Sequence, residues 1–137
     1  MILDVSDLSP EPLHQQITRQ VRALILAGEL REGEALPSIR ALARQQRVSV
    51  ITVQRAYEDL ERESLIQARR GKGFFVTGLS EERKAAMARQ RLRQALGGAL
   101  DSARSEGMTD DDIRGVFEDL VDGAPPQSDE APVEDLE

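Results

Sequence analysis

Cysteine and tryptophan are both absent from this 137-residue sequence, and histidine occurs once. Without cysteine the chain has no disulfide and no thiolate ligand for a metal, which fits a reducing compartment. No nucleophile–base arrangement and no phosphate-cradling loop stands out, and His14 has no metal-ligating residue type beside it that would suggest more than packing. We therefore expect no enzymatic activity, no cofactor and no metal ion.

Long apolar runs are also missing. No stretch approaches the roughly 20 apolar residues that a membrane-spanning helix needs, and the N-terminus has no basic segment followed by an apolar one. We expect a soluble, cytoplasmic protein. Aromatic residues make up only 3% of the chain, so its core must be built from Leu, Ile, Val and Ala, whose helical spacing predicts a mainly α fold.

The net charge of −7 is unevenly distributed. Residues 36–78 contain eight Lys or Arg against four Asp or Glu, whereas residues 122–137 contain six acids and no base. Because a local basic patch steers a protein toward nucleic acid, the acidic total does not exclude DNA binding. The acidic, proline-containing residues 122–137 predict a disordered tail, which either only solubilises the chain or competes with DNA for the basic face.

Three short helices are predicted in the first half. Ser9 is expected to cap the first helix, which carries an apolar stripe and ends at Gly28. Ser38 caps a second helix, whose inward positions are Ile39, Leu42 and Ala43. Ser49 caps a third helix running to about Ser64, with Val53, Ala56, Tyr57 and Leu60 on one side and Ile51, Gln54 and Arg55 on the other.

Residues 65–77 predict a β-hairpin, because two short apolar runs flank a basic tip containing Gly71 and Gly73. Residues 80–106 then predict one long helix, where Gly97-Gly98 marks a kink or a close helix contact. Thr109 caps a last helix that reaches Val121. Asp110, Asp111 and Asp112 are explained by helix capping, since a calcium loop would need a glycine and a distal Glu.

Two helices joined by a short turn, with a helix before them and a basic hairpin after them, form a winged helix-turn-helix. In this architecture the second helix of the pair enters the DNA major groove, where every base pair presents a distinct edge. The candidate base-reading residues at the start of that helix are Val50, Ile51, Thr52, Gln54 and Arg55. The candidate phosphate and minor-groove contacts are Arg40, Arg44, Arg47, Ser49, Thr52, Arg69, Arg70 and Lys72.

Several separated blocks resemble the GntR family of regulators in their order and spacing. They are Pro12-Leu13-His14-Gln15-Gln16-Ile17, Gly28-Glu29-Leu30, Leu36-Pro37-Ser38-Ile39-Arg40-Ala41-Leu42-Ala43, Val48-Ser49-Val50-Ile51-Thr52-Val53 and Gly71-Lys72-Gly73-Phe74-Phe75-Val76. The resemblance covers about residues 11–79. It implies a winged-helix fold, binding to a palindromic operator as a dimer, and DNA contacts from Arg40, Ser49, Thr52 and the Gly71–Gly73 tip.

The short C-terminal part is similar to that of the YtrA subfamily, which implies dimerisation through these helices and a repressor function. Three positions depart from the family pattern: Val50 replaces an Arg, Ser64 replaces a Gly before the first hairpin strand, and His14 stands where an aromatic residue is common. The operator preference of the family therefore does not carry over to this chain.

We therefore predict an N-terminal arm (1–10), a winged helix-turn-helix domain (11–79), a helical dimerisation region (80–121) and an acidic tail (122–137). The dimer contacts are expected from Leu92, Leu96, Leu100, Ile113, Val116, Phe117 and Leu120. The predicted partners are an operator in double-stranded DNA and a second copy of the chain. A small-molecule effector, whose identity the sequence does not reveal, would lie between the winged domain and the C-terminal helices or at the dimer interface.

Simpler interpretations remain beside these. Arg44, Arg47 and Arg62 also fit a solvated helix face, Ile51 also fits local packing, and the hairpin charges also fit protection of a strand edge. Tyr57, Phe74 and Phe75 are expected in the core. Two alternative functions are a winged-helix module that binds proteins and the remnant of an enzyme fusion with an aminotransferase-like domain. The acidic end of the chain argues against the second.

Overall fold

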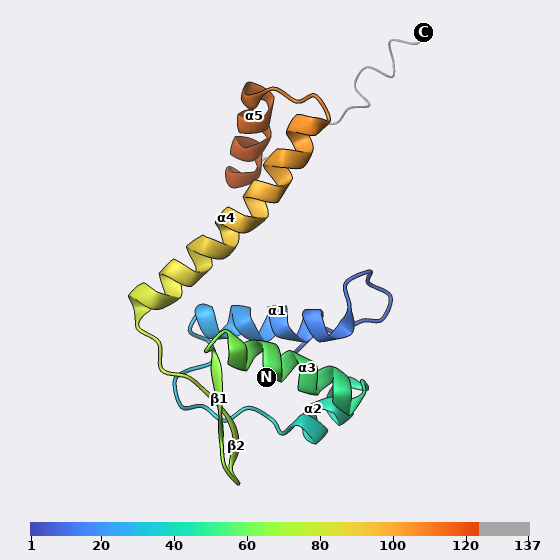
Figure 1. The fold of residues 1–137 in the computed structure, drawn as a ribbon, viewed down its shortest axis with the longest axis vertical. Coiled ribbons are helices and arrows are strands. Elements are labelled where there is room, and N and C mark those ends of the chain that lie inside the picture. The colour runs from blue at the N-terminus through green and yellow to red at the C-terminus, as the bar shows by residue number, and fades with distance from the viewer. Residues whose placement is uncertain (124–137) are drawn as a thin grey trace. The chain divides into compact units, whose positions relative to one another are not determined.

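The computed structural model describes residues 1–123 as five helices and one two-stranded sheet (Figure 1). The elements are α1 (Leu13–Leu26), α2 (Ile39–Gln46), α3 (Val50–Arg62), β1 (Ile66–Arg69), β2 (Gly73–Val76), α4 (Glu81–Ser105) and α5 (Asp110–Val121). This mainly α architecture with one hairpin confirms the predicted fold class. The predicted disordered tail lies outside the described residues, apart from 122 and 123.

The chain divides into two compact units, Met1–Arg89 and a second unit that begins at Gln90. The division falls within α4 rather than at the start of that helix, because its first turns belong with the first unit and Met87 packs against that unit's core. The arm, the winged domain and the beginning of α4 are therefore one unit.

The core of the first unit is aliphatic, as the scarcity of aromatic residues predicts. It is built from α1, α2, α3 and the hairpin, and α1 and α2 each pack against α3. Its fully buried side chains include Ile17, Val21, Ile25, Leu42, Val53, Tyr57, Leu60, Leu65, Ile66 and Val76. Burial of this apolar surface supplies the main stabilising free energy of the unit.

The predicted start of the first helix is wrong. Pro12, with extended backbone angles, occupies the N-cap position of α1, and no side chain caps that helix. Ser9 instead accepts a hydrogen bond at Oγ from the Glu11 N–H, at 3.2 Å, within the preceding loop. A proline keeps the residue before it out of helical backbone angles. Glu11, which precedes Pro12, therefore cannot be part of the helix, and α1 begins after Pro12. The predicted end is confirmed, with Gly28 at φ +83°.

The hairpin has a third extended partner that the sequence did not predict. β1 and β2 are antiparallel, with Ile66 opposite Val76. Ala35 forms a bridge to Phe75 on the other edge of β2, and the Val76 N–H donates to the Glu34 carbonyl at 2.9 Å. This pairing covers one edge of the sheet and ties the segment before α2 to the hairpin.

Residues 1–10 dock on α1 rather than extending away. Leu3 is buried, and the Asp4 N–H donates to Gln20 Oε1 at 2.7 Å. Gln16, itself buried, donates from Nε2 to the carbonyls of Ser6 and Glu11, both at 2.8 Å. Glutamine amides here pair with the backbone of a segment that has no regular structure of its own.

The two C-terminal helices begin and end where the sequence predicts. Ser80 Oγ accepts from the Arg83 N–H at 3.0 Å at the start of α4, and Gly107, at φ +92°, lies in the turn before α5. Thr109 and Asp112 form a reciprocal capping box at the start of α5. α4 runs through Gly97-Gly98, where an added Cβ would meet no atom within 4 Å. The predicted close helix contact at this pair is therefore absent within residues 1–123.

Candidate nucleic-acid interface

The helix-turn-helix is held in place by two serine caps and a left-handed turn. Ser38 Oγ accepts from the Ala41 N–H at 3.1 Å, and Ser49 Oγ accepts from the Thr52 N–H at 3.0 Å, as predicted. Between the helices, Arg47 adopts φ +57°, and the Val48 N–H returns to the Ala43 carbonyl at 3.0 Å. These bonds satisfy the ends of both helices and fix the direction in which α3 starts.

α3 has two chemically opposite faces, as its sequence predicts. Val53, Ala56, Tyr57 and Leu60 are completely buried against α1, α2 and the hairpin. On the opposite side Ile51, Gln54 and Arg55 are exposed; we call these three residues the reading face. Ile51 is 68% exposed, so the simpler interpretation that it packs locally is not supported. An exposed apolar side chain beside Gln and Arg suits contact with a thymine methyl group and base edges.

Ser49 and Thr52 have a structural role at the start of α3. Their hydroxyl groups share a hydrogen bond of 2.8 Å, in addition to the cap made by Ser49 Oγ. Both hydroxyls are therefore held beside the helix N-terminus, where the first backbone N–H groups and the helix dipole favour an anion. Val50, 41% exposed, stands at the same end of the helix.

The basic side chains around the reading face are exposed, and within residues 1–123 they form no ion pair. This holds for Arg40 and Arg44 on α2, for Arg47 in the turn, and for Arg55 on α3. Arg62 differs, because its Nη1 lies 2.7 Å from Asp59 Oδ1. The acidic residues of α3 all lie in its second half, which leaves its first half and α2 positively charged.

The hairpin, residues 66–76, presents three cations and is called the wing below. Arg69 stacks over the ring of Phe75, with its guanidinium carbon 4.4 Å from the ring centroid. Arg70 and Lys72 are exposed at the tip, where Gly71 and Gly73 adopt φ values of +73° and +101°. Phe75, predicted as a core residue, is half-buried and lies outside the core cluster, because side chains alternate along β2 and its neighbours Phe74 and Val76 face the core.

Tyr57 connects α3 to the segment before α2. Its hydroxyl donates to the Pro37 carbonyl at 2.7 Å, and its ring meets Phe74 edge to face with centroids 5.0 Å apart. Burial raises the pKa of Tyr57, so the phenol stays neutral and keeps its donor hydrogen. The sequence predicted Tyr57 as core but not this bond. The sequence did offer a signal for such a bond, because a tyrosine predicted in the core needs a hydrogen-bond partner for its hydroxyl group.

An ion pair from α1 to the end of α3 was also missed. The Arg22 guanidinium donates from Nε and Nη2 to the two Glu63 carboxylate oxygens, both at 2.8 Å. Arg22 is largely buried, so this bidentate pair fixes the far end of α3 against α1. The two residues are 41 positions apart, and nothing in the local sequence links them.

The acidic cluster at the start of α5 is occupied by protein contacts. Asp110 pairs with Arg104 at 3.1 Å, Asp111 pairs with Arg114 at 3.3 Å, and Asp112 completes the capping box. Among residues 1–123, no group of three His, Asp or Glu side chains is placed to hold a metal ion, and no helix is long and apolar enough to cross a membrane.

Comparison with known proteins agrees with this geometry. Residues 13–76 match the model of the bacterial regulatory proteins of the gntR family. The chain is 32% identical over 99 residues to the HTH-type transcriptional repressor YtrA of Bacillus subtilis, covering 69% of this chain and 76% of that protein.

Solved structures extend the similarity to the fold. A GntR family transcriptional regulator from Listeria monocytogenes superposes with a TM-score of 0.68 at 25% identity, over 80% of this chain and 96% of that one. The DNA-binding domain of AraR in complex with its operator ORX1 superposes with a TM-score of 0.51 at 26% identity, over 56% of this chain and 99% of that one. With a helix-turn-helix, a basic wing and these relatives, the chain belongs to the GntR family of bacterial DNA-binding transcriptional regulators.

Proposed function

We propose that this protein is a repressor that binds a palindromic operator as a homodimer. One α3 helix from each copy would enter the major groove of one half-site, while α2 and the wing contact the flanking backbone. The observation that carries the proposal is the reading face, which is exposed and surrounded by cations without ion pairs in residues 1–123.

Each side chain has a role that follows from its chemistry. Arg55 donates two hydrogen bonds to guanine, Gln54 pairs with adenine, and Ile51 contacts a thymine methyl group. Val50 lies at the same end of the helix but has no polar group that could form a hydrogen bond with a base. The phosphate contacts come from Arg40, Arg44, Ser49, Thr52 and the wing residues Arg69, Arg70, Gly71, Lys72 and Gly73.

The dimer is proposed from the apolar surface of the second unit, beginning at Gln90. Val116, Leu120 and Val121 on α5 are 51%, 70% and 67% exposed, and Leu92 on α4 is 55% exposed. Exposed large apolar side chains that gather on one pair of helices are costly in water and are typical of an interaction site. We therefore assign dimerisation to the predicted contacts, namely Leu92, Leu96, Leu100, Ile113, Val116, Phe117 and Leu120. We assign a repressor role because the chain is similar to YtrA of Bacillus subtilis, which is a transcriptional repressor.

The test is a gel-shift titration with a fragment of the promoter of the protein's own gene, repeated at several salt concentrations. Arg40→Ala and Arg55→Ala should each weaken binding by roughly ten- to hundredfold, because each removes a contact to DNA. Arg62→Ala is the matched control, since Arg62 is paired with Asp59, and it should leave the affinity unchanged. Unchanged affinity and unchanged salt dependence in both test variants would instead favour a protein-binding module.

A further inference from the structure

α4 and α5 carry opposite charges. Between residues 83 and 100, α4 contains five cations and no acid: Arg83, Lys84, Arg89, Arg91 and Arg93. Residues 110–122 contain six acids and one arginine. Glu81, Glu82 and Asp101 also lie on α4, but basic residues outnumber acidic ones there, whereas acidic residues predominate on α5.

Some of these charges are neutralised within the chain, and others are not. The acids in the first turn of α5 are used by Arg104, Arg114 and the capping box. Further along α5, Glu118 and Asp119 form no ion pair with residues 1–123. On α4 the same holds for Arg89 and Arg93.

The unmatched charges border the exposed apolar surface. Arg89 and Arg93 each precede a leucine of α4, Leu92 and Leu96, by three residues, which places them on neighbouring positions of the helix surface. On α5, Asp119 follows Val116 by three residues, and Glu118 precedes Val121 by three. Each helix therefore has an apolar stripe with a charged border, basic on α4 and acidic on α5.

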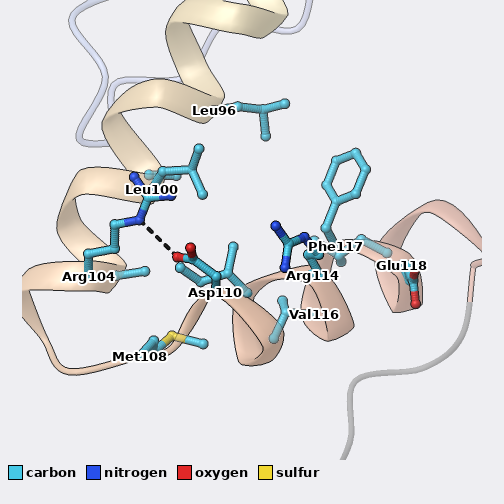
Figure 2. Close-up of a pocket in the computed structure, with 13 residues that line it drawn as sticks. Leu96, Leu100, Arg104, Met108, Asp110, Arg114, Val116, Phe117 and Glu118 are labelled. Carbon is cyan, nitrogen blue, oxygen red and sulfur yellow. Dashed lines mark hydrogen bonds and ion pairs between the residues drawn. The ribbon is translucent and has the colours of Figure 1, made fainter.

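A hollow between the two helices is lined by residues from both apolar stripes. It has a volume of about 470 Å³, and its lining is mostly apolar, with Leu96, Leu100, Ile113 and Phe117 among the contributing residues. Figure 2 shows Leu96 and Leu100 projecting from α4 toward the helix that carries Phe117 and Glu118. Glu118 is part of the lining, so a carboxylate borders the apolar surface.

We propose that the dimer is cross-paired, with the acidic-bordered stripe of α5 in one copy lying against the basic-bordered stripe of α4 in the other. Glu118 and Asp119 of each copy then face Arg89 and Arg93 of its partner, and a two-fold axis repeats the contact. This inference rests on the homodimer proposed above. Pairing of α4 with α4, or of α5 with α5, would instead bring together two helices whose net charges have the same sign, which opposes association.

A charge-swap experiment on the full chain separates these arrangements. The acidic variant combines Arg89→Glu with Arg93→Glu, and the basic variant combines Glu118→Lys with Asp119→Lys. Sedimentation equilibrium gives the dimer dissociation constant of each, and circular dichroism checks that each is folded. Cross-pairing predicts that both variants dimerise roughly ten- to hundredfold more weakly than the unaltered chain, because each places like charges in both symmetric contacts.

Two rescue measurements complete the test. An equimolar mixture of the two variants should form heterodimers with an affinity close to that of the unaltered chain, and so should a chain carrying all four substitutions. Raising the salt concentration should weaken the unaltered dimer, because it screens attractive pairs. If the unaltered chain dimerises but the two variants dimerise equally well, or if salt strengthens the dimer, cross-pairing is wrong while the dimer stands. A chain that stays monomeric at all concentrations overturns the dimer itself.

Discussion

The Tyr57 hydroxyl donates a hydrogen bond of 2.7 Å to the Pro37 carbonyl, which joins the buried face of α3 to the residue preceding the Ser38 cap of α2. The two helices of the DNA-binding motif are thus connected by a polar contact as well as by apolar packing. Since Tyr57 is on the same helix as the reading face, this bond also fixes the rotation of α3 about its axis.

Tyr57→Phe tests this contact. The ring and its packing on Phe74 remain, while the Pro37 carbonyl loses its buried donor, so the free energy of unfolding should fall by about 1–2 kcal/mol. Urea denaturation followed by circular dichroism measures the change. Arg62→Ala, at an exposed position on the same helix, is the control and should change stability by less than about 0.5 kcal/mol. A Tyr57→Phe variant as stable as the unaltered chain would show that the bond contributes nothing.

Ser64→Gly should stabilise the protein. Ser64 adopts φ +65° just after α3, with its N–H bonded to the Glu61 carbonyl and the Leu65 N–H bonded to the Leu60 carbonyl. A left-handed conformation costs a serine about 1–2 kcal/mol, and glycine avoids this cost but loses more entropy on folding. We expect a net gain of about 0.5–1 kcal/mol in thermal or urea denaturation, with no change in DNA affinity. A loss of stability would contradict the strained geometry.

Arg47→Gly should separate stability from DNA binding. Arg47 is the other non-glycine residue with positive φ in the described chain, at +57°, so glycine should again raise the free energy of unfolding by about 0.5–1 kcal/mol. Because the exposed Arg47 side chain is one of the phosphate contacts that the sequence predicts, its removal should lower the affinity for operator DNA severalfold and decrease the salt dependence. The matched comparison is Ser64→Gly, which relieves the same strain far from the reading face. Equal DNA affinity in the two variants would remove Arg47 from the interface.

Ile51→Ala should alter operator choice without altering stability. Ile51 is 68% exposed, so truncating it removes little buried surface, and the free energy of unfolding should change by less than about 0.5 kcal/mol. In gel shifts with operator variants, the loss should be largest where a thymine methyl group is present and should disappear when uracil replaces that thymine. Val53→Ala is the contrasting variant, because Val53 is fully buried and its truncation should destabilise the fold. An equal loss of affinity on all DNA sequences would argue against base contact by Ile51.

The elements that the sequence predicted correctly are those defined by neighbouring residues. Ser38, Ser49 and Thr109 each cap a helix through a bond to an N–H three residues along the chain, so the pattern is visible in a short window. The failure at Ser9 has the same origin: the two prolines that follow it bias the residues before them toward extended backbone, and this outweighed the preference of serine for a cap.

The features that the sequence missed are contacts between distant segments. The bridge from Ala35 to Phe75, the pair of Arg22 with Glu63, and the docking of residues 1–10 through Gln16 and Gln20 all join positions ten or more residues apart. Partners of this kind are selected by how the helices pack, which no local pattern encodes.

The sequence by itself determined the winged helix-turn-helix, the family and the residues on the reading face, because helical periodicity and capping chemistry are local. Only the tertiary structure decided which charged side chains are already used. It pairs Arg22 with Glu63, 41 positions away, while Arg40 and Arg55 form no ion pair within residues 1–123. A charge becomes available to DNA only when folding leaves no carboxylate within reach of it, and that depends on packing rather than on residue type.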